Sequence, residues 1–123
     1  MIDYAKAQAA CETYIRSLQA SDVETLLALF DDNASIEDPV GTALREGKSA
    51  LREFYSVACE GVLSAALSGA PRLAGNEVAF PFTVTAGTVG EELTINIIDV
   101  FKFNEAGKVV SMRAFWGPNN IGS

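Results

Sequence analysis

Residues 93–103 read LTINIIDVFKF. Side chains alternate between the two faces of a β-strand. One face would therefore carry Leu93, Ile95, Ile97, Asp99, Phe101 and Phe103, and the other Thr94, Asn96, Ile98, Val100 and Lys102. The stretch predicts a long strand with one apolar and one mixed face. A single aspartate lies in the middle of the apolar face.

That aspartate, Asp99, is the most informative residue of the chain. A carboxylate on an apolar face costs several kcal/mol unless it is paired or protonated. A bulge that turns Asp99 to solvent would remove the cost. If Asp99 stays inside, burial raises the pKa of its carboxyl, and the neutral acid can donate a hydrogen bond.

Two further stretches have the composition and alternation of strands, at residues 78–85 and 109–115. Residues 104–107, NEAG, form a turn that joins the last two strands into a hairpin. Residues 63–73 are a weaker strand candidate because they are rich in alanine, serine and glycine. The predicted inner faces are Val78, Phe80, Phe82, Val84 and Ala86 on one strand, and Val110, Met112, Ala114 and Trp116 on the other. If these faces join that of Asp99, they enclose an apolar chamber or a plain core.

The first half of the chain has helical spacing instead. Residues 4–18 form an apolar stripe of Ala7, Cys11, Tyr14, Ile15 and Leu18, and residues 48–59 form another of Leu51, Phe54, Tyr55 and Ala58. Ser21 and Glu24 form a capping box that opens a second helix through Leu27 and Phe30, which residues 31–33 end. Residues 35–38 alternate like a short strand that Pro39 and Gly41 terminate. The order predicts a single α+β domain over residues 1–123, with three N-terminal helices on one face of a curved antiparallel sheet.

Composition excludes several function classes. The 123 residues include 16 Asp and Glu against nine Lys and Arg, a net charge of −7, so nucleic acid and membranes are not expected partners. Histidine is absent, which removes serine–histidine triads and histidine-based metal sites. Cys11 and Cys59 lie outside any CxxC pattern and are expected to be buried, reduced thiols. The N-terminal residues lack the pattern of a signal peptide, which favours a cytoplasmic location.

Three more polar side chains are candidates for a site. Asp38 alternates with Ile36 and precedes a Pro-Val-Gly turn, so it is either a turn-forming aspartate or a catalytic one. Tyr14 and Tyr55 lie on the buried stripes of two helices, where a tyrosine is ordinarily a core residue with a satisfied hydroxyl. Together with Asp99 they favour a shared polar network.

With these residues the chain resembles the Δ5-3-ketosteroid isomerases, members of the nuclear-transport-factor-2-like superfamily. The resemblance spans nearly the whole sequence. It is strongest in residues 37–41 (EDPVG), 52–55 (REFY), 98–103 (IDVFKF) and 104–114 (NEAGKVVSMRA), and Tyr14 stands in a similar YIRSL context. The resemblance implies a cone-shaped fold whose curved, mixed sheet carries the helices on its concave face. It also implies a homodimer with no cofactor and no metal.

The resemblance further implies a role for each candidate residue. Asp38 would be the general base, and Tyr14 and a protonated Asp99 would form an oxyanion hole. Tyr55 would orient Tyr14 by a hydrogen bond. This family is the established case of a carboxylic acid kept neutral at neutral pH. A steroid substrate would lie against Phe54, Phe82, Val84, Phe101, Met112 and Trp116.

Other functions remain open on this fold. A non-catalytic carrier of hydrophobic molecules would need the chamber but not Asp38, and a scaffold would need neither. A cyclase or an epoxide hydrolase is a further alternative. The hydrolase would need a polar Asp-Arg-Asp cluster, and Arg113, the arginine of the terminal strands, lies on the face opposite to Met112.

Overall fold

The computed structural model describes residues 1–122. Its helices are α1 (Tyr4–Ala20), α2 (Val23–Leu27), α3 (Lys48–Glu60) and the 3-10 turn η1 (Pro118–Asn120). Its strands are β1 (Phe30–Glu37), β2 (Arg45–Glu46), β3 (Val62–Leu67), β4 (Arg72–Ala74), β5 (Glu77–Thr88), β6 (Glu91–Phe103), β7 (Val109–Phe115) and β8 (Ile121–Gly122).

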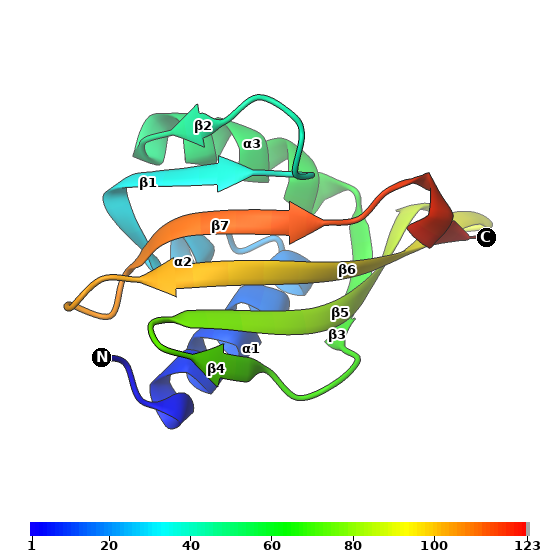
Figure 1. Ribbon diagram of the computed structural model, residues 1–123. Helices are drawn as coiled ribbons and strands as arrows, with labels where there is room; N and C mark the ends of the chain where they lie inside the picture. The colour runs from blue at the N-terminus through cyan, green and yellow to red at the C-terminus, as the bar shows by residue number, and fades with distance from the viewer. Residues whose placement is uncertain (123) are drawn as a thin grey trace.

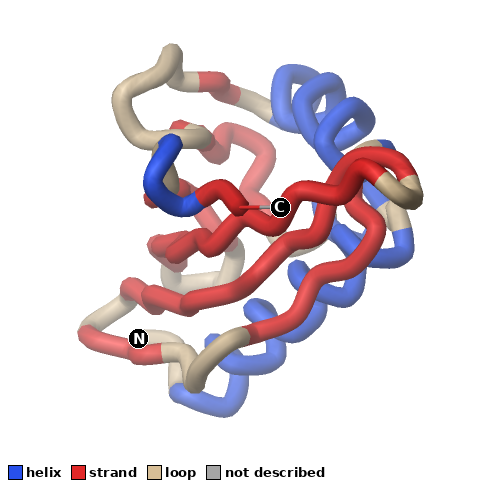
Figure 2. Tube along the Cα trace, turned by 90° about the vertical axis from the view of Figure 1, so that its right-hand side faces the viewer, coloured by secondary structure: helices blue, strands red, loops and turns tan. Residues whose placement is uncertain are grey.

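The strands form one curved, mixed sheet. Its order is β2-β1-β7-β6-β5-β3, with β4 paired to β5 and β8 paired to β6. Strands β1 and β7 are parallel, whereas the other pairs are antiparallel. All three α-helices lie on the same side of the sheet (Figure 1), and the sheet bends around them (Figure 2). The predicted α+β architecture is confirmed, and the parallel pair makes the sheet mixed, as the resemblance implies.

The core lies between the helices and the concave face of the sheet. The alternation predicted for β5 is confirmed, since Val78, Phe80, Phe82 and Val84 are all buried. In β6, Asp99, Phe101 and Phe103 are buried in the same way, while Leu93 at the far end is exposed. Each aromatic ring removed from water stabilises the fold by about 2–3 kcal/mol. These alternating positions therefore fix which face of the sheet receives the helices.

The second helix differs from the prediction at both ends. Ser21 closes α1 with a left-handed backbone at φ 53°, and Asp22 caps α2 by accepting a hydrogen bond from the Thr25 amide at 3.1 Å. The helix ends at Leu27, and Phe30 is the first residue of β1. Residues 31–33 belong to that strand and do not merely end a helix, because β1 pairs with β7 far along the chain, starting with Phe30 opposite Val109.

The inner face of β7 also differs from the prediction at the first position of the strand. Val109 is fully buried, and Val110, expected there, is only half-buried. The cause is a register shift in the pairing with β6: Lys102 pairs with Ser111, whereas Phe103 pairs with Val109. A bulge of this kind places two consecutive residues against one partner and changes the face that follows.

The weak strand candidate at residues 63–73 forms two short strands, β3 and β4, both paired with β5. Cys11 and Cys59 are buried and free, as the sequence predicts. None of the helices within residues 1–122 is long and apolar enough to cross a bilayer.

Candidate active site

Asp99 points toward the helices from the middle of β6. It is opposite Phe80 on one side and Ala114 on the other, and both of these neighbours are fully buried. Its side chain is 1% exposed, which excludes the bulge that would turn it to solvent. Its Oδ1 atom has no hydrogen-bond partner among residues 1–122. A buried, unpartnered carboxyl oxygen destabilises a protein and requires an explanation, and a ligand that binds to it is one.

Tyr14 and Tyr55 form a pair on the helices facing Asp99. The Tyr14 side chain comes from α1 and that of Tyr55 from α3, and their hydroxyl oxygens are hydrogen-bonded at 2.9 Å. Both side chains are at most 2% exposed. Edge-on contacts with Phe80 and Phe101, at 5.9 and 5.2 Å between ring centroids, hold the Tyr14 ring. The packing therefore fixes the direction of the Tyr14 hydroxyl.

Asp38 lies directly after β1, where the chain turns away from the sheet. Its Oδ1 accepts a hydrogen bond of 2.8 Å from the indole Nε1 of Trp116, which directly follows β7. The parallel pairing of β1 with β7 brings these two residues together, and the Val40 amide donates to the Ala114 carbonyl at 2.8 Å in the same region. The neighbouring turn is closed by Glu37, whose carboxylate accepts from the Gly41 amide at 3.0 Å. Asp38 is therefore not the turn-forming carboxylate.

A cavity of about 240 Å³ connects these groups. Most of its lining is apolar, and its polar members are the four residues expected from the sequence together with the Trp116 indole. The lining residues are Tyr14, Leu18, Asp38, Phe54, Tyr55, Ala58, Gly61, Val62, Phe82, Val84, Ala86, Ile95, Ile97, Asp99 and Trp116. An apolar cavity with a few convergent polar groups is typical of a small-molecule site.

Four of the six apolar residues expected against the ligand, Phe54, Phe82, Val84 and Trp116, line this cavity. Phe101 and Met112 do not. Both are completely buried in the core, and the Phe101 ring is packed against Tyr14 and Phe80. Phe101 supports the wall of the cavity from behind through its contact with Tyr14.

The expected list omitted several lining residues. Ile95 and Ile97 share the face of Asp99, so the alternation of β6 already indicated them. Gly61 and Val62 follow α3, in a region where the sequence carried no clear pattern. Leu18 was assigned only to the core.

The two carboxyl groups have different surroundings. Burial raises the pKa of Asp99 well above its ordinary value, and the nearby charge of Asp38 raises it further, while the Tyr14 hydroxyl opposes the shift. Burial also raises the pKa of Asp38, but the Trp116 hydrogen bond and the Arg45 guanidinium oppose that shift by stabilising the carboxylate. Burial therefore favours a neutral Asp99, whereas one hydrogen bond and one nearby positive charge favour the charged form of Asp38.

Burial also raises the pKa of Tyr14 and of Tyr55 well above the ordinary value, so both phenols remain protonated donors. The arrangement offers a proton acceptor, Asp38, and two neutral donors, Tyr14 and Asp99, around one apolar cavity. It can remove a proton from a ligand and stabilise the negative charge that forms. No three metal-binding side chains cluster anywhere in residues 1–122.

Comparison with known proteins places this site in context. Residues 11–112 match the model of the SnoaL-like domain. The chain is 33% identical over 117 residues to a steroid Δ-isomerase of Nocardioides simplex. The aligned region covers 95% of this chain and 94% of the relative. It is 32% identical over 110 residues to epoxide hydrolase LasB of Streptomyces lasalocidi, covering 85% of this chain but 39% of that longer protein.

A solved structure is also very similar. It is that of SalBIII, described as an epoxide hydrolase/cyclase-like enzyme in pyran ring formation of the polyether salinomycin. The two structures superpose with a TM-score of 0.88 and 32% sequence identity, over 99% of this chain and 98% of the other. The relatives are enzymes, and they differ in activity.

Proposed function

Because the chain belongs to the SnoaL-like domain family, within the nuclear-transport-factor-2-like superfamily, we propose that it is a steroid Δ-isomerase. It would convert 3-oxo-Δ5-steroids to the conjugated 3-oxo-Δ4-steroids. The observation that carries the proposal is the cavity in which Asp38 lies with two buried neutral donors, Tyr14 and Asp99. The similarity to a steroid Δ-isomerase over 94% of its length supports the same activity.

The reaction is an intramolecular proton transfer. The Asp38 carboxylate takes a proton from C4, and the electrons of the C–H bond move into a dienolate whose charge lies on the C3 oxygen. Asp38, now a carboxylic acid, returns the proton to C6. The double bond then lies between C4 and C5, in conjugation with the ketone, and the base is regenerated.

The oxyanion is the difficult part of this reaction. A carboxylate is a weak base for a carbon acid, so the developing charge must be stabilised by donors already in place. We assign this role to the Tyr14 hydroxyl and the protonated Asp99 carboxyl. Tyr55 would act through Tyr14: its hydroxyl is 2.9 Å from that of Tyr14, so it positions this donor.

A homodimer is part of the proposal. The face of the sheet turned away from the helices carries large apolar side chains, with Ile98 47% and Phe115 41% exposed in the single chain. These two residues pair directly across β6 and β7, so they form a continuous apolar patch. A second copy of the chain would cover it, which analytical ultracentrifugation tests directly.

Epoxide opening is the second candidate, favoured by the similarity to LasB and to SalBIII. A neutral Asp99 would donate its proton to the epoxide oxygen, and Asp38 would accept one from the attacking hydroxyl. An Asp-Arg-Asp cluster of the kind expected for a hydrolase does not line this cavity within residues 1–122, and Arg113 pairs instead with Glu37 at 3.6 Å. The two donors, Tyr14 and Asp99, suit the oxygen of a ketone as well as that of an epoxide.

An ultraviolet assay with 5-androstene-3,17-dione tests the proposal, because the conjugated product absorbs where the substrate does not. We expect turnover by the wild type and a loss on the order of 10²–10⁴-fold in Asp38→Asn, which keeps the shape but removes the base. The steroid should still bind to this variant. Absence of enone formation by the wild type, with ring closure of an epoxy alcohol instead, would transfer the assignment to the second candidate.

A further inference from the structure

A groove along α3 adjoins the catalytic cavity. It measures about 500 Å³ and shares Phe54 and Ala58 with the catalytic cavity. Ligand sites in proteins ordinarily occupy about 300–1,000 Å³, and the catalytic cavity of about 240 Å³ alone falls below this range. A rigid polycyclic ligand with its ketone beside Asp99 would need more space than this cavity alone offers, and the groove next to Phe54 supplies it. The groove is lined by Arg45, Ala50, Glu53, Phe54, Val57 and Ala58.

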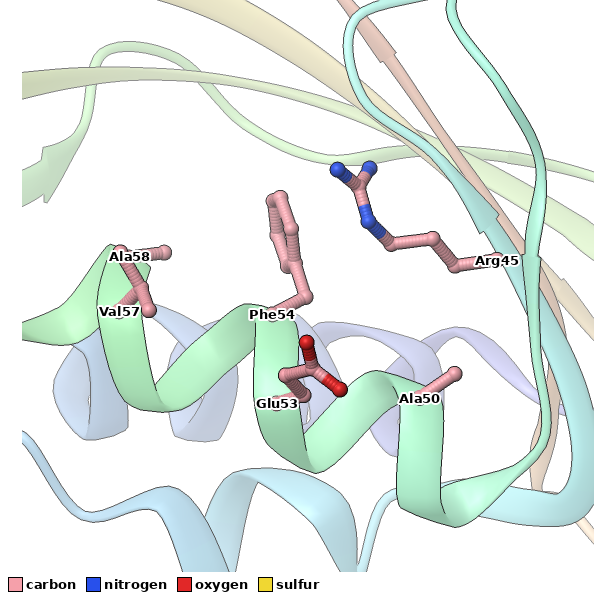
Figure 3. A pocket seen from close by; sticks show the side chains of 6 residues that line it. All are labelled: Arg45, Ala50, Glu53, Phe54, Val57 and Ala58. Carbon is pink, nitrogen blue, oxygen red and sulfur yellow. The ribbon is translucent and has the colours of Figure 1, made fainter.

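The floor of this groove is apolar. Ala50, Phe54, Val57 and Ala58 follow the helical spacing that puts them on one face of α3 (Figure 3). Val57 is 71% exposed, whereas Ala50, Phe54 and Ala58 are half-buried, so the face is open to solvent at Val57. Such a floor suits the hydrocarbon body of a ligand.

One wall is cationic. Arg45 pairs opposite Ile36, a buried residue of β1, and its side chain reaches from β2 toward Phe54, as Figure 3 shows. Its guanidinium carbon lies 4.7 Å from the centre of the Phe54 ring. Stacking on an aromatic face fixes the plane of a guanidinium and leaves the donors on its edge free.

Those donors have no protein partner. Within residues 1–122 the Arg45 guanidinium donates no hydrogen bond and forms no ion pair, whereas Arg52 pairs with Glu24 and Arg113 with Glu37. The side chain is half-buried, so part of its surface has also lost contact with bulk water. A partly desolvated cation whose fork of donors lacks an acceptor favours an anionic oxygen pair from a ligand.

We propose that this groove recognises a carboxylate at the end of the substrate remote from the reacting ketone. A carboxylate matches the planar donor fork of Arg45 with two parallel hydrogen bonds. Glu53 is exposed at the rim of the same groove and repels an anion, so a ligand carboxylate is expected to bind beside Arg45. The substrate class is a 3-oxo-Δ5-steroid with an acidic side chain; this inference relies on the proposed function for the ketone end alone.

Binding and turnover are measured separately. Trp116 is the single tryptophan of the chain and lines the catalytic cavity, so quenching of its fluorescence reports occupancy. The ligands are saturated 3-keto steroids, which are not turned over, with side-chain carboxylates of increasing length and their methyl esters. Each pair is titrated against wild type, Arg45→Met, Arg45→Lys and Arg52→Met, and turnover of 5-androstene-3,17-dione is assayed in parallel. The Arg52→Met variant is the control: it also removes one positive charge, but from a residue of α3 that does not line the groove.

We expect at least one acid to bind the wild type about tenfold more tightly than its ester, the effect of a charge-assisted hydrogen bond. The ratio should fall to about one in Arg45→Met, take an intermediate value in Arg45→Lys and persist in Arg52→Met. Acid and ester are compared on the same variant, so an effect of Arg45 on Asp38 changes both affinities alike and leaves their ratio unchanged. Equal binding of acid and ester to the wild type at every side-chain length, or a ratio that survives in Arg45→Met, overturns the inference.

The two proposals fail independently. Turnover of the neutral dione without a preference for acids leaves the isomerase assignment intact and removes the carboxylate subsite. A preference for acids that depends on Arg45, without isomerisation of the dione, keeps the subsite and removes the isomerase assignment.

Discussion

Replacing Asp99 with asparagine changes the way in which the stability of this protein depends on pH. The amide has nearly the shape of the protonated carboxyl but cannot ionise. Burial raises the pKa of Asp99 in the folded protein, whereas the unfolded chain has an ordinary aspartate pKa of about 3.9. Between these two values the unfolded state releases a proton that the folded state keeps.

The sign of the effect follows from this difference. Because the unfolded wild type binds fewer protons in this window, the free energy of unfolding of the wild type falls as the pH rises. The slope attributable to Asp99 is about 1.4 kcal/mol per pH unit. Over two pH units inside the window, the wild type loses about 2.7 kcal/mol relative to Asp99→Asn. Stabilities of single domains are commonly about 5–15 kcal/mol, so this change is readily measured.

Urea unfolding at several pH values from 5 upward, followed by circular dichroism at one protein concentration, provides the test. The readout is the difference in slope and not the absolute stability, because the amide adds a constant offset and Asp38 titrates in both proteins. Asp32→Asn makes the same chemical change at a side chain that is 92% exposed and should run parallel to the wild type. Parallel curves for wild type and Asp99→Asn would mean that Asp99 is already ionised in the folded protein. The neutral donor on which the mechanism depends would then be absent.

Other substitutions test the remaining parts of the site. Tyr14→Phe should raise the barrier by about 3 kcal/mol, as expected for one lost oxyanion donor, with a smaller increase for Tyr55→Phe; unchanged steady-state kinetics for Tyr14→Phe would place the ketone elsewhere. Trp116→Phe removes the hydrogen bond that favours the Asp38 carboxylate, so the pKa of Asp38 rises and the acid limb of the kcat/KM profile moves to higher pH; a limb that stays in place would contradict this assignment. Cys11 is buried and its thiol has a pKa raised to about 12, so a thiol reagent should label it in the native protein only on the time scale of unfolding, and immediate labelling would show a more open core.

Local patterns were sufficient for the two longest strands of the sheet, β5 and β6. The alternation of side chains along β5 and β6 predicted which residues face the helices, and it put Asp99 on that face before any neighbour was known. Alternation is a property of an extended backbone, so it needs no knowledge of the partner strand. The same holds for the buried stripes of α1 and α3, which carry Tyr14 and Tyr55.

The errors occurred where distant pairing overrides local preference. Phe30 continues the helical spacing of α2, but its pairing with Val109 makes it the start of β1. The bulge between β6 and β7 exchanges Val109 for Val110 on the inner face, and a bulge depends on two strands at once. No pattern within a single segment contains this information.

The sequence by itself determined that this chain is an α+β domain with a carboxyl group in the middle of an apolar strand face, because composition and periodicity are properties of single segments. Only the tertiary structure decided what that carboxyl meets. It brought Asp38 against Trp116 across 78 positions of sequence, joined the hydroxyls of Tyr14 and Tyr55, and set Arg45 over Phe54 in the groove beside the cavity. Hydrogen bonds and the stacking of charges on rings act over a few ångströms, so they depend on how distant segments are packed together.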